Sequence, residues 1–143
     1  MRPQTKQVIA IAQSSTTNAA TATGNVDTLG FDFCSLDVIM ATSNDTTNNP
    51  TVFKLAESDD TVVSNFADIT AFVGDTAWTI PDAVTAGNWG VKFNVDCRGR
   101  KRYLRLSISP LTTQVITAIA NLSLGDESGS NTTVAGVKAL VQA

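Results

Sequence analysis

The sequence contains no histidine and, among its 143 residues, only two cysteines and two glutamates. Without histidine, Ser–His–Asp and Cys–His catalysis and nearly all catalytic zinc sites are excluded. The cysteines, Cys34 and Cys97, are too few for a four-thiolate metal site. No pair of acidic residues stands out as the two carboxylates of a glycosidase. We therefore expect a protein that is not an enzyme and that holds no metal and no cofactor.

Charged residues are also scarce, at 16% of the chain against roughly 25% in an average soluble domain. Long apolar runs are missing, so we expect neither a membrane-spanning helix nor a secretion signal, and we expect a soluble chain. The abundant residues are 20 Thr, 11 Ser and 10 Asn. Threonine favours strands and asparagine favours turns, whereas the helix formers Glu and Leu are few. The composition therefore predicts an all-β protein.

Alternating apolar and polar residues predict where the strands lie. One strand is expected at 31–42 and another at 51–57, joined as a hairpin through a long polar loop. The clearest alternation runs over 89–97 and resumes over 104–108 after a turn around Gly99, which predicts a second hairpin. A last strand is expected at 115–124.

Six or seven strands in a chain of this length predict a single β-sandwich with jelly-roll-like connections. The segment before the sandwich is rich in Ser, Thr and Ala and has few large apolar groups, so we expect an extended N-terminal arm over 1–24 that lies along a neighbouring molecule. The sandwich domain is expected over 25–127, and a C-terminal tail, helical or extended, over 128–143. In the arm we expect contacts with a neighbouring subunit from Gln7, Val8 and Ile9.

Half of the ten basic residues fall within eight positions, at Arg98, Arg100, Lys101, Arg102 and Arg105. The rest of the chain has five basic and thirteen acidic residues. This segment is either a contact site for phosphate or for an acidic protein surface, or a solvated loop tip. A protein partner is favoured over nucleic acid because the chain as a whole is acidic.

Two further groups of residues receive structural interpretations. Glu57, Asp59 and Asp60 form an acidic turn that matches a calcium loop poorly, so we expect a capped turn that could pair with the basic segment. Cys97 shares a strand face with apolar side chains and is expected to be buried. Whether it pairs with Cys34 stays open.

Several blocks of sequence carry a resemblance to a known family: 27–33, 35–38, 54–60 and 98–106. In this order they resemble the small β-rich capsid decoration, or cement, proteins of tailed bacteriophages and prophages. The resemblance covers about residues 26–125, and the block Arg-Gly-Arg-Lys-Arg-Tyr-Leu is its most specific part. It implies a protein without catalytic residues that lies on the outside of a shell of major capsid protein.

Together with the composition and strand pattern, this resemblance implies a virion structural protein that binds the outer surface of a tailed-phage capsid and stabilises it by bridging major capsid protein subunits. We expect a homo-oligomer (dimer or trimer), made in the bacterial host cytoplasm and located on the capsid exterior, without membrane or nucleic-acid partners. One alternative is a head- or tail-fibre β-sandwich that binds carbohydrate or a receptor. It requires an exposed aromatic platform, for which Trp78, Trp89 and Tyr103 are the candidates. The other alternative is nucleic-acid binding through the basic segment, which would weaken steeply with salt.

Overall fold

The computed structural model describes residues 4–41, 49–81, 88–124, 137 and 139–143. Strands account for most of the described chain, and the one helical element is a single 3-10 turn. The elements are β1 (Thr5–Thr16), β2 (Ala22–Asp27), β3 (Phe33–Met40), β4 (Val52–Ser58), η1 (Val63–Asn65), β5 (Ala67–Val73), β6 (Trp89–Asp96), β7 (Tyr103–Ser109), β8 (Gln114–Ser123) and β9 (Ala139–Gln142). Within this part of the chain, no helix is long and apolar enough to cross a membrane.

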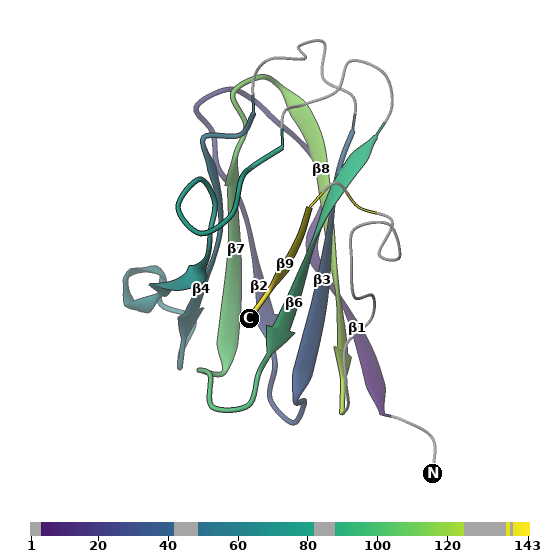
Figure 1. The fold of residues 1–143 in the computed structure, drawn as a ribbon, viewed down its shortest axis with the longest axis vertical. Coiled ribbons are helices and arrows are strands. Elements are labelled where there is room, and N and C mark those ends of the chain that lie inside the picture. Colours follow the sequence, from purple (N-terminus) through teal and green to yellow (C-terminus); the bar gives the residue numbers. More distant parts are fainter. Residues whose placement is uncertain (1–3, 42–48, 82–87, 125–136, 138) are drawn as a thin grey trace.

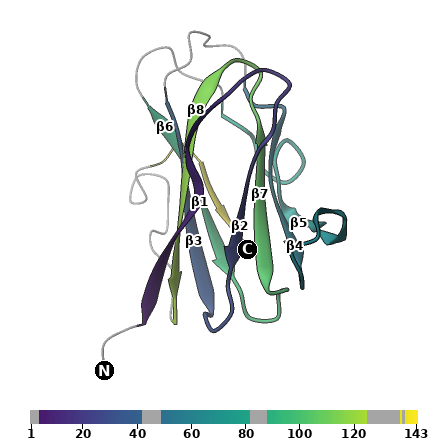
Figure 2. The same ribbon diagram turned by 180° about the vertical axis from the view of Figure 1, so that it is seen from behind.

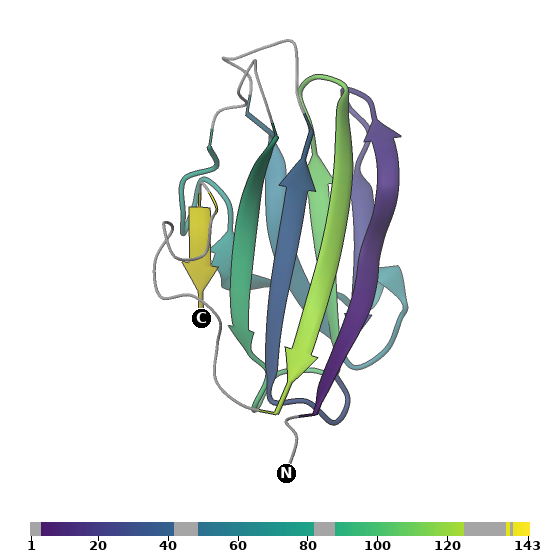
Figure 3. The same ribbon diagram turned by 90° about the vertical axis from the view of Figure 1, so that its right-hand side faces the viewer.

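The strands form two sheets that pack face to face as a sandwich (Figures 1 and 2). One sheet has five strands in the order β1-β8-β3-β6-β9, and the other has four in the order β2-β7-β4-β5. Figure 3 shows the five-stranded sheet in front, with β1 at one edge and β9 at the other. The predicted all-β sandwich is confirmed.

The strand order is that of a jelly roll. β4 pairs with β5, β3 with β6, β2 with β7 and β1 with β8, so the chain pairs as one long hairpin around the β4–β5 connection. This hairpin is rolled up, because β8 also pairs with β3 and β7 also pairs with β4. Rolling a hairpin in this way produces the two Greek keys of an eight-stranded jelly roll. β9 is a ninth strand outside the eight-stranded jelly roll, and it pairs in parallel with β6.

The core lies between the sheets and follows the alternation in the sequence. On β3, Leu36, Val38 and Met40 are fully buried, whereas Ile39 between them is exposed on the outer face. An aromatic cluster joins the sheets near their middle, with ring centroids 5.4–5.8 Å apart. Its members are Phe53, Phe72, Trp78 and Phe93. Three of the four ring contacts are edge-to-face, and such contacts stabilise beyond simple burial of area.

The predicted strands at 31–42, 51–57, 89–97, 104–108 and 115–124 are confirmed, but both predicted hairpins are wrong. β6 and β7 lie in different sheets, and so do β3 and β4. The connection at 97–102 therefore crosses from one layer of the sandwich to the other. The reason is physical: a strand shows the same alternation whether its neighbour in sequence pairs beside it or packs opposite it.

The N-terminal arm predicted over 1–24 is also wrong for the described residues. Thr5–Thr16 form β1, which pairs with β8, and Ala22–Asp27 form β2, which pairs with β7. Although this segment has few large side chains, its backbone completes both sheets, and Ile11 and Val26 are buried in the core. Backbone pairing and a few anchors are therefore enough to order it without a neighbouring molecule.

Part of the predicted tail over 128–143 is a strand. Ala139–Gln142 form β9, and Val141 reaches the core at 6% exposure. The Ala143 carbonyl accepts a hydrogen bond from the Asp96 N–H at 3.0 Å, and the Ala143 N–H donates to the Asn94 carbonyl at 3.1 Å. Residues 128–136 and 138 lie outside the described part of the chain.

Candidate contact surface at one end of the sandwich

The basic segment forms the connection between β6 and β7, which we call the basic loop (residues 97–102). Gly99 has a positive φ of 80°, a conformation that glycine adopts without strain, and the Arg100 N–H closes the turn on the Cys97 carbonyl at 3.2 Å. The β2–β3 connection lies at the same end of the sandwich (Figure 1). The Cys97 N–H binds the Asp32 carbonyl of that connection at 2.8 Å. We call the end of the sandwich formed by the basic loop and the β2–β3 connection (residues 28–32) the loop end.

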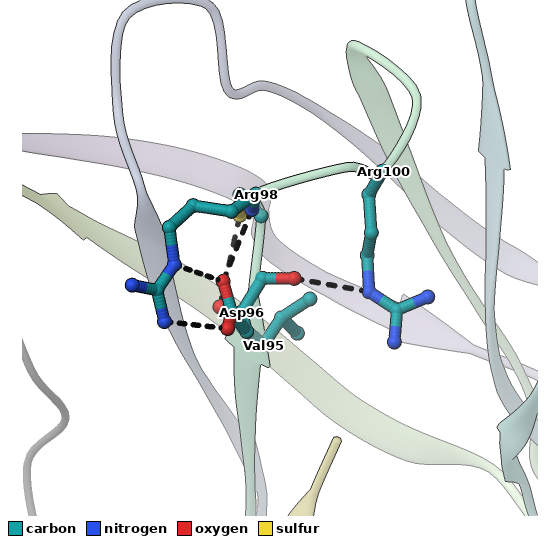
Figure 4. Close-up of polar contacts among 5 residues, drawn as sticks. Val95, Asp96, Arg98 and Arg100 are labelled. Atoms are coloured by element: carbon teal, nitrogen blue, oxygen red, sulfur yellow. Dashed lines mark hydrogen bonds and ion pairs between the residues drawn. The ribbon is translucent and has the colours of Figure 1, made fainter.

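Arg98 is held by Asp96, the last residue of β6 (Figure 4). Its Nε and Nη2 donate to the two carboxylate oxygens of Asp96 at 2.9 and 2.7 Å, and its backbone N–H donates to Oδ1 at 3.0 Å. These hydrogen bonds to the Arg98 guanidinium and N–H lower the pKa of Asp96 to about 2. The bidentate pair fixes the charge of Arg98 against its own chain.

Arg102 makes a second bidentate pair, with Asp27 at the end of β2. Nε and Nη2 donate to the carboxylate at 2.9 and 2.8 Å, and the guanidinium lies 4.8 Å from the centre of the Tyr103 ring. The hydrogen bond from Arg102 lowers the pKa of Asp27. This pair joins the β2–β3 connection to the basic loop.

Arg100 connects the basic loop to the other sheet. Its Nε donates to the Asp96 carbonyl at 3.1 Å (Figure 4), its Nη1 lies 3.9 Å from Glu57, and its guanidinium lies 5.6 Å from the centre of the Phe72 ring. Glu57 also accepts a hydrogen bond from the Lys101 N–H at 3.2 Å. The predicted pairing between the acidic turn and the basic segment therefore occurs within one chain.

The remaining two basic residues form no ion pair with described residues. The Arg105 Nη1 donates to the Asn25 side chain at 3.3 Å, and its guanidinium lies 5.5 Å from the Phe66 ring. The Lys101 side chain is exposed. The positive charge of the basic segment is thus largely neutralised, because Asp27, Glu57 and Asp96 surround it. The loop end is a mixed-charge surface.

The acidic turn is capped, as predicted. Asp60 accepts hydrogen bonds from the Val62 N–H at 2.9 Å and from the Asn65 amide at 2.8 Å. Within the described residues, no group of three or more His, Cys, Asp or Glu side chains could hold a metal ion. The carboxylate stabilises the turn itself.

Among the described residues, the large exposed apolar side chains other than Ile9 are a feature that sequence reasoning missed. Most of them lie in the β2–β3 and β4–β5 connections or just after β8, and the others lie on the outer face of the five-stranded sheet. In order of exposure they are Ile9 (67%), Leu29 (65%), Val63 (64%), Val62 (53%), Ile39 (45%) and Leu124 (44%). Exposed apolar groups rimmed by charge are typical of protein interaction surfaces. The sequence indicated this surface only weakly, because single apolar residues in loops are common and do not by themselves indicate an interaction site.

The predicted contact residues Gln7, Val8 and Ile9 are not part of the loop end. They lie on β1 at the edge of the five-stranded sheet, where Gln7 and Ile9 are exposed and Val8 packs against the core. No hydrogen bond or ion pair joins them to the basic loop among the described residues. The predicted contact residues therefore lie on two different elements, the edge strand β1 and the segment that forms the basic loop and the start of β7.

A groove of about 470 Å³ lies on the outer face of the five-stranded sheet, with Gln7, Ile39 and Asn121 among its lining residues. Asp37 also lines it, and its Oδ1 lies 2.7 Å from the Lys92 Nζ, which donates to the Ser35 hydroxyl at 2.9 Å. Lys92 is only 8% exposed. Sequence reasoning did not select these residues, because only the register of β3 against β6 places Asp37 opposite Lys92.

The candidate aromatic platform is packed into the protein. Trp89 is 5% exposed, Trp78 belongs to the aromatic cluster, and Tyr103 is half-buried beside Arg102. Base or sugar stacking needs an open ring face. Trp89 therefore offers no open ring face, and the rings of Trp78 and Tyr103 are partly covered by neighbouring side chains.

Both cysteines are buried and unpaired. The predicted burial of Cys97 is confirmed, and Cys34 is fully enclosed on β3. Burial raises the pKa of both thiols, to about 11 for Cys97. The thiolate is the reactive form, so both groups are inert near neutral pH.

We predict that a maleimide at pH 8 labels both thiols much more slowly in the native protein than in the unfolded protein. The expected retardation is at least about a hundredfold, because labelling requires an opening of the sandwich. Mass spectrometry of samples labelled with and without urea measures it. Rapid native labelling of either cysteine would contradict the packing described above.

A second prediction concerns the acid titration of Asp96. Its carboxylate should titrate near pH 2 in the folded protein, against an ordinary value of 3.8. Because the folded pKa is the lower one, this ion's contribution to stability is present above about pH 4 and is lost as the pH falls towards 2. Carboxyl NMR should show the Asp96 pKa rising in Arg98→Ala and unchanged in the control Arg105→Ala. The same Asp96 pKa in the two variants would contradict the assignment of the Asp96 pKa shift to Arg98.

Comparisons with known proteins give a fold and no family. No protein-family model matches the chain, and no curated protein matches it. A chain in the structure of infectious bursal disease virus, Gx strain, superposes with a TM-score of 0.52 at 10% identity, over 87% of this chain. This chain spans about a third (33%) of the length of that virus chain. At this identity the similarity concerns the fold alone.

Two weaker structural similarities have TM-scores below 0.5 and carry no argument. The SPBc2 prophage-derived protein YomS gives 0.44 at 10% identity, with 85% of this chain and 96% of that chain covered. A family 35 carbohydrate-binding module from Clostridium thermocellum gives 0.35 at 15% identity, with 84% and 98% covered.

Proposed function

We propose that this protein is a non-enzymatic virion structural protein that binds the outer surface of a tailed-phage capsid. In this role it stabilises the shell by bridging neighbouring subunits of the major capsid protein. It is made in the bacterial host cytoplasm, is located on the capsid exterior and acts as a homo-oligomer. The sequence resemblance to decoration proteins supports this proposal, and the jelly-roll fold is compatible with it.

The observation that carries the proposal is the convergence of the resembling blocks. The blocks over 27–33, 54–60 and 98–106 are far apart in sequence but meet at the loop end. The Arg102–Asp27 pair and the contacts of Glu57 with Arg100 and Lys101 hold them together. These contacts therefore combine the three blocks into one rigid arrangement of loops.

Rigid loops suit a protein that must dock many times on one lattice. Preorganised loops lose little conformational entropy on binding. The loop end presents the exposed Leu29 and the exposed charge of Lys101, and Val62 and Val63 are exposed in the β4–β5 connection. Apolar anchors with a charged rim are the usual composition of a protein interface. Binding many neighbouring copies then makes a modest contact energy per copy sufficient.

The test is to mix purified protein with capsids that lack it. We expect saturable binding at a fixed number of copies per capsid and a higher melting temperature of the particle. Leu29→Ser should weaken binding about tenfold or more, whereas the matched change Ile39→Ser on the sheet face should have little effect. Absence of stoichiometric binding would contradict the proposed function. Equal effects of the two variants would contradict the loop end as its contact surface.

A further inference from the structure

β1 is an edge strand whose first half is regular. Within the described residues, it pairs with β8 on one side and with no strand on the other. Residues Thr5 to Ile9 match Ser123 to Ile119 one for one, and the register then shifts twice, after Ile9 and after Ile11. Irregularities of this kind protect an edge from pairing with other strands. The unprotected part of the edge is therefore Thr5–Ile9.

The direction of the backbone groups on this edge follows from two hydrogen bonds. The Leu124 N–H donates to the Gln4 carbonyl at 3.3 Å, so Gln4 faces β8. The carbonyl of Ser123, the residue opposite Thr5, faces β3 instead and accepts from the Asp32 N–H at 3.1 Å. Backbone groups alternate along a strand. Thr5, Gln7 and Ile9 therefore turn their N–H and C=O groups to the open edge.

The side chains of this segment do not block a partner strand. It contains no proline and no acidic residue, and its one charge is Lys6. Lys6 lies close enough to Asp27 of its own chain to lower the pKa of that carboxyl, so this charge already has an opposite charge nearby. Ile9, at 67% exposure, is the most exposed large apolar residue described. Proteins that protect an edge strand usually place charges or proline there.

We propose that two copies of this chain pair through β1, antiparallel, about a two-fold axis at Gln7. Thr5 of each copy then lies opposite Ile9 of the other, Lys6 opposite Val8, and Gln7 opposite Gln7. Three pairs with outward backbone groups supply about six hydrogen bonds between the copies. The two five-stranded sheets become one continuous sheet across the dimer.

The occupant is a second copy because the edge is complementary to itself. A two-fold axis places one patch against the same patch, which requires side chains that tolerate their own kind. Gln7 is opposite Asn121 on β8, so the axis creates a row of four amides, each able to donate and to accept. The same register keeps the two Lys6 residues from facing each other directly. No other register pairs all five regular residues.

This contact is small, since five residues bury less than the roughly 1,000 Å² of a stable interface. We therefore expect a weak dimer in solution, which neighbouring sites on a lattice would favour through high local concentration. This dimer specifies the geometry of the homo-oligomer in the proposed function, and it rests only on the homo-oligomer and not on capsid binding. The pairing itself needs no capsid, so it can be tested separately from capsid binding.

Cysteine cross-linking in the full-length protein tests the register. Gln7→Cys places two thiols about 5.5 Å apart between α-carbons, within the range of a disulfide. The native cysteines are buried and do not compete. Under mild oxidation we expect Gln7→Cys to form covalent dimers at least about tenfold faster than Thr5→Cys or Ile9→Cys alone. An equimolar mixture of Thr5→Cys and Ile9→Cys should cross-link about half as fast as Gln7→Cys, because half of the dimers formed in the mixture contain one copy of each variant.

The outcomes separate the pairing from its alternatives. A Gln7→Cys variant that dimerises no faster than Thr5→Cys would overturn the proposal, and so would rapid self-cross-linking of Thr5→Cys. Gln7→Pro removes an outward N–H and should lower the sedimentation-detected dimer while the circular dichroism spectrum stays native. Cross-linking without capsid binding would leave the dimer standing and contradict the proposed function alone.

Discussion

Replacing Phe93 with alanine is expected to lower the free energy of unfolding by about 4 kcal/mol. Phe93 is fully buried on β6 and meets three other rings, those of Phe53, Phe72 and Trp78, at centroid distances of 5.5–5.8 Å. Phe53 and Phe72 come from the opposite sheet, so the truncated side chain would leave a cavity between the layers. Neither layer can close it, because each is held by its backbone pairing.

Equilibrium unfolding in urea measures this loss, and Phe66→Ala is its control. Phe66 is also a phenylalanine, but it is half-buried outside the core and stacks with Arg105. We expect its truncation to cost about 1 kcal/mol, in proportion to the smaller area buried. Equal losses in the two variants would contradict the placement of Phe93 at the centre of the sandwich.

The second large effect is expected at Gly24 on β2. An added Cβ would overlap the Ala10 carbonyl oxygen and would lie 2.8 Å from the Ile11 side chain. These atoms belong to β1, where Ala10 lies between Ile9 and Ile11, which are both paired with β8. Gly24→Ala is therefore expected to destabilise the protein by about 3 kcal/mol through overpacking.

Gly90→Ala on β6 is the matched control. There the nearest atom to an added Cβ is the Val38 carbonyl oxygen at 3.1 Å, which a small shift can relieve. We expect its free energy of unfolding to change by less than about 1 kcal/mol. If Gly24→Ala were as stable as Gly90→Ala in urea unfolding, the close approach of β1 and β2 would be wrong.

The positions and faces of most strands could be predicted from the sequence. On β3 and β6 the alternation identified the buried residues, including Leu36 and Phe93, because side chains on a strand point to opposite faces in turn. The partners of each strand could not be predicted. The connection over 97–102 links β6 to β7 across the sandwich, and the same polar turn would also serve a hairpin.

The candidate site was predictable only in part. The basic residues are adjacent in sequence, but two of the carboxylates that neutralise them, Asp27 and Glu57, come from distant segments. Leu29 is exposed because the turn that holds it points outward, which a lone leucine in a sequence does not reveal. The edge at Thr5–Ile9 was interpreted as part of an arm because the segment 1–24 is rich in Ser, Thr and Ala and has few large apolar groups. The backbone of Thr5–Ile9 is ordered by its pairing with β8, and this pairing cannot be predicted from composition.

Cryo-electron microscopy of the assembled phage particle tests the central claim most directly. The proposal predicts density for this sandwich at symmetry-repeated positions on the outer surface of the head, with the loop end against the major capsid protein. It also predicts that one copy bridges at least two capsid subunits. A head surface without this density, or the protein found only in a fibre, would contradict the proposed function.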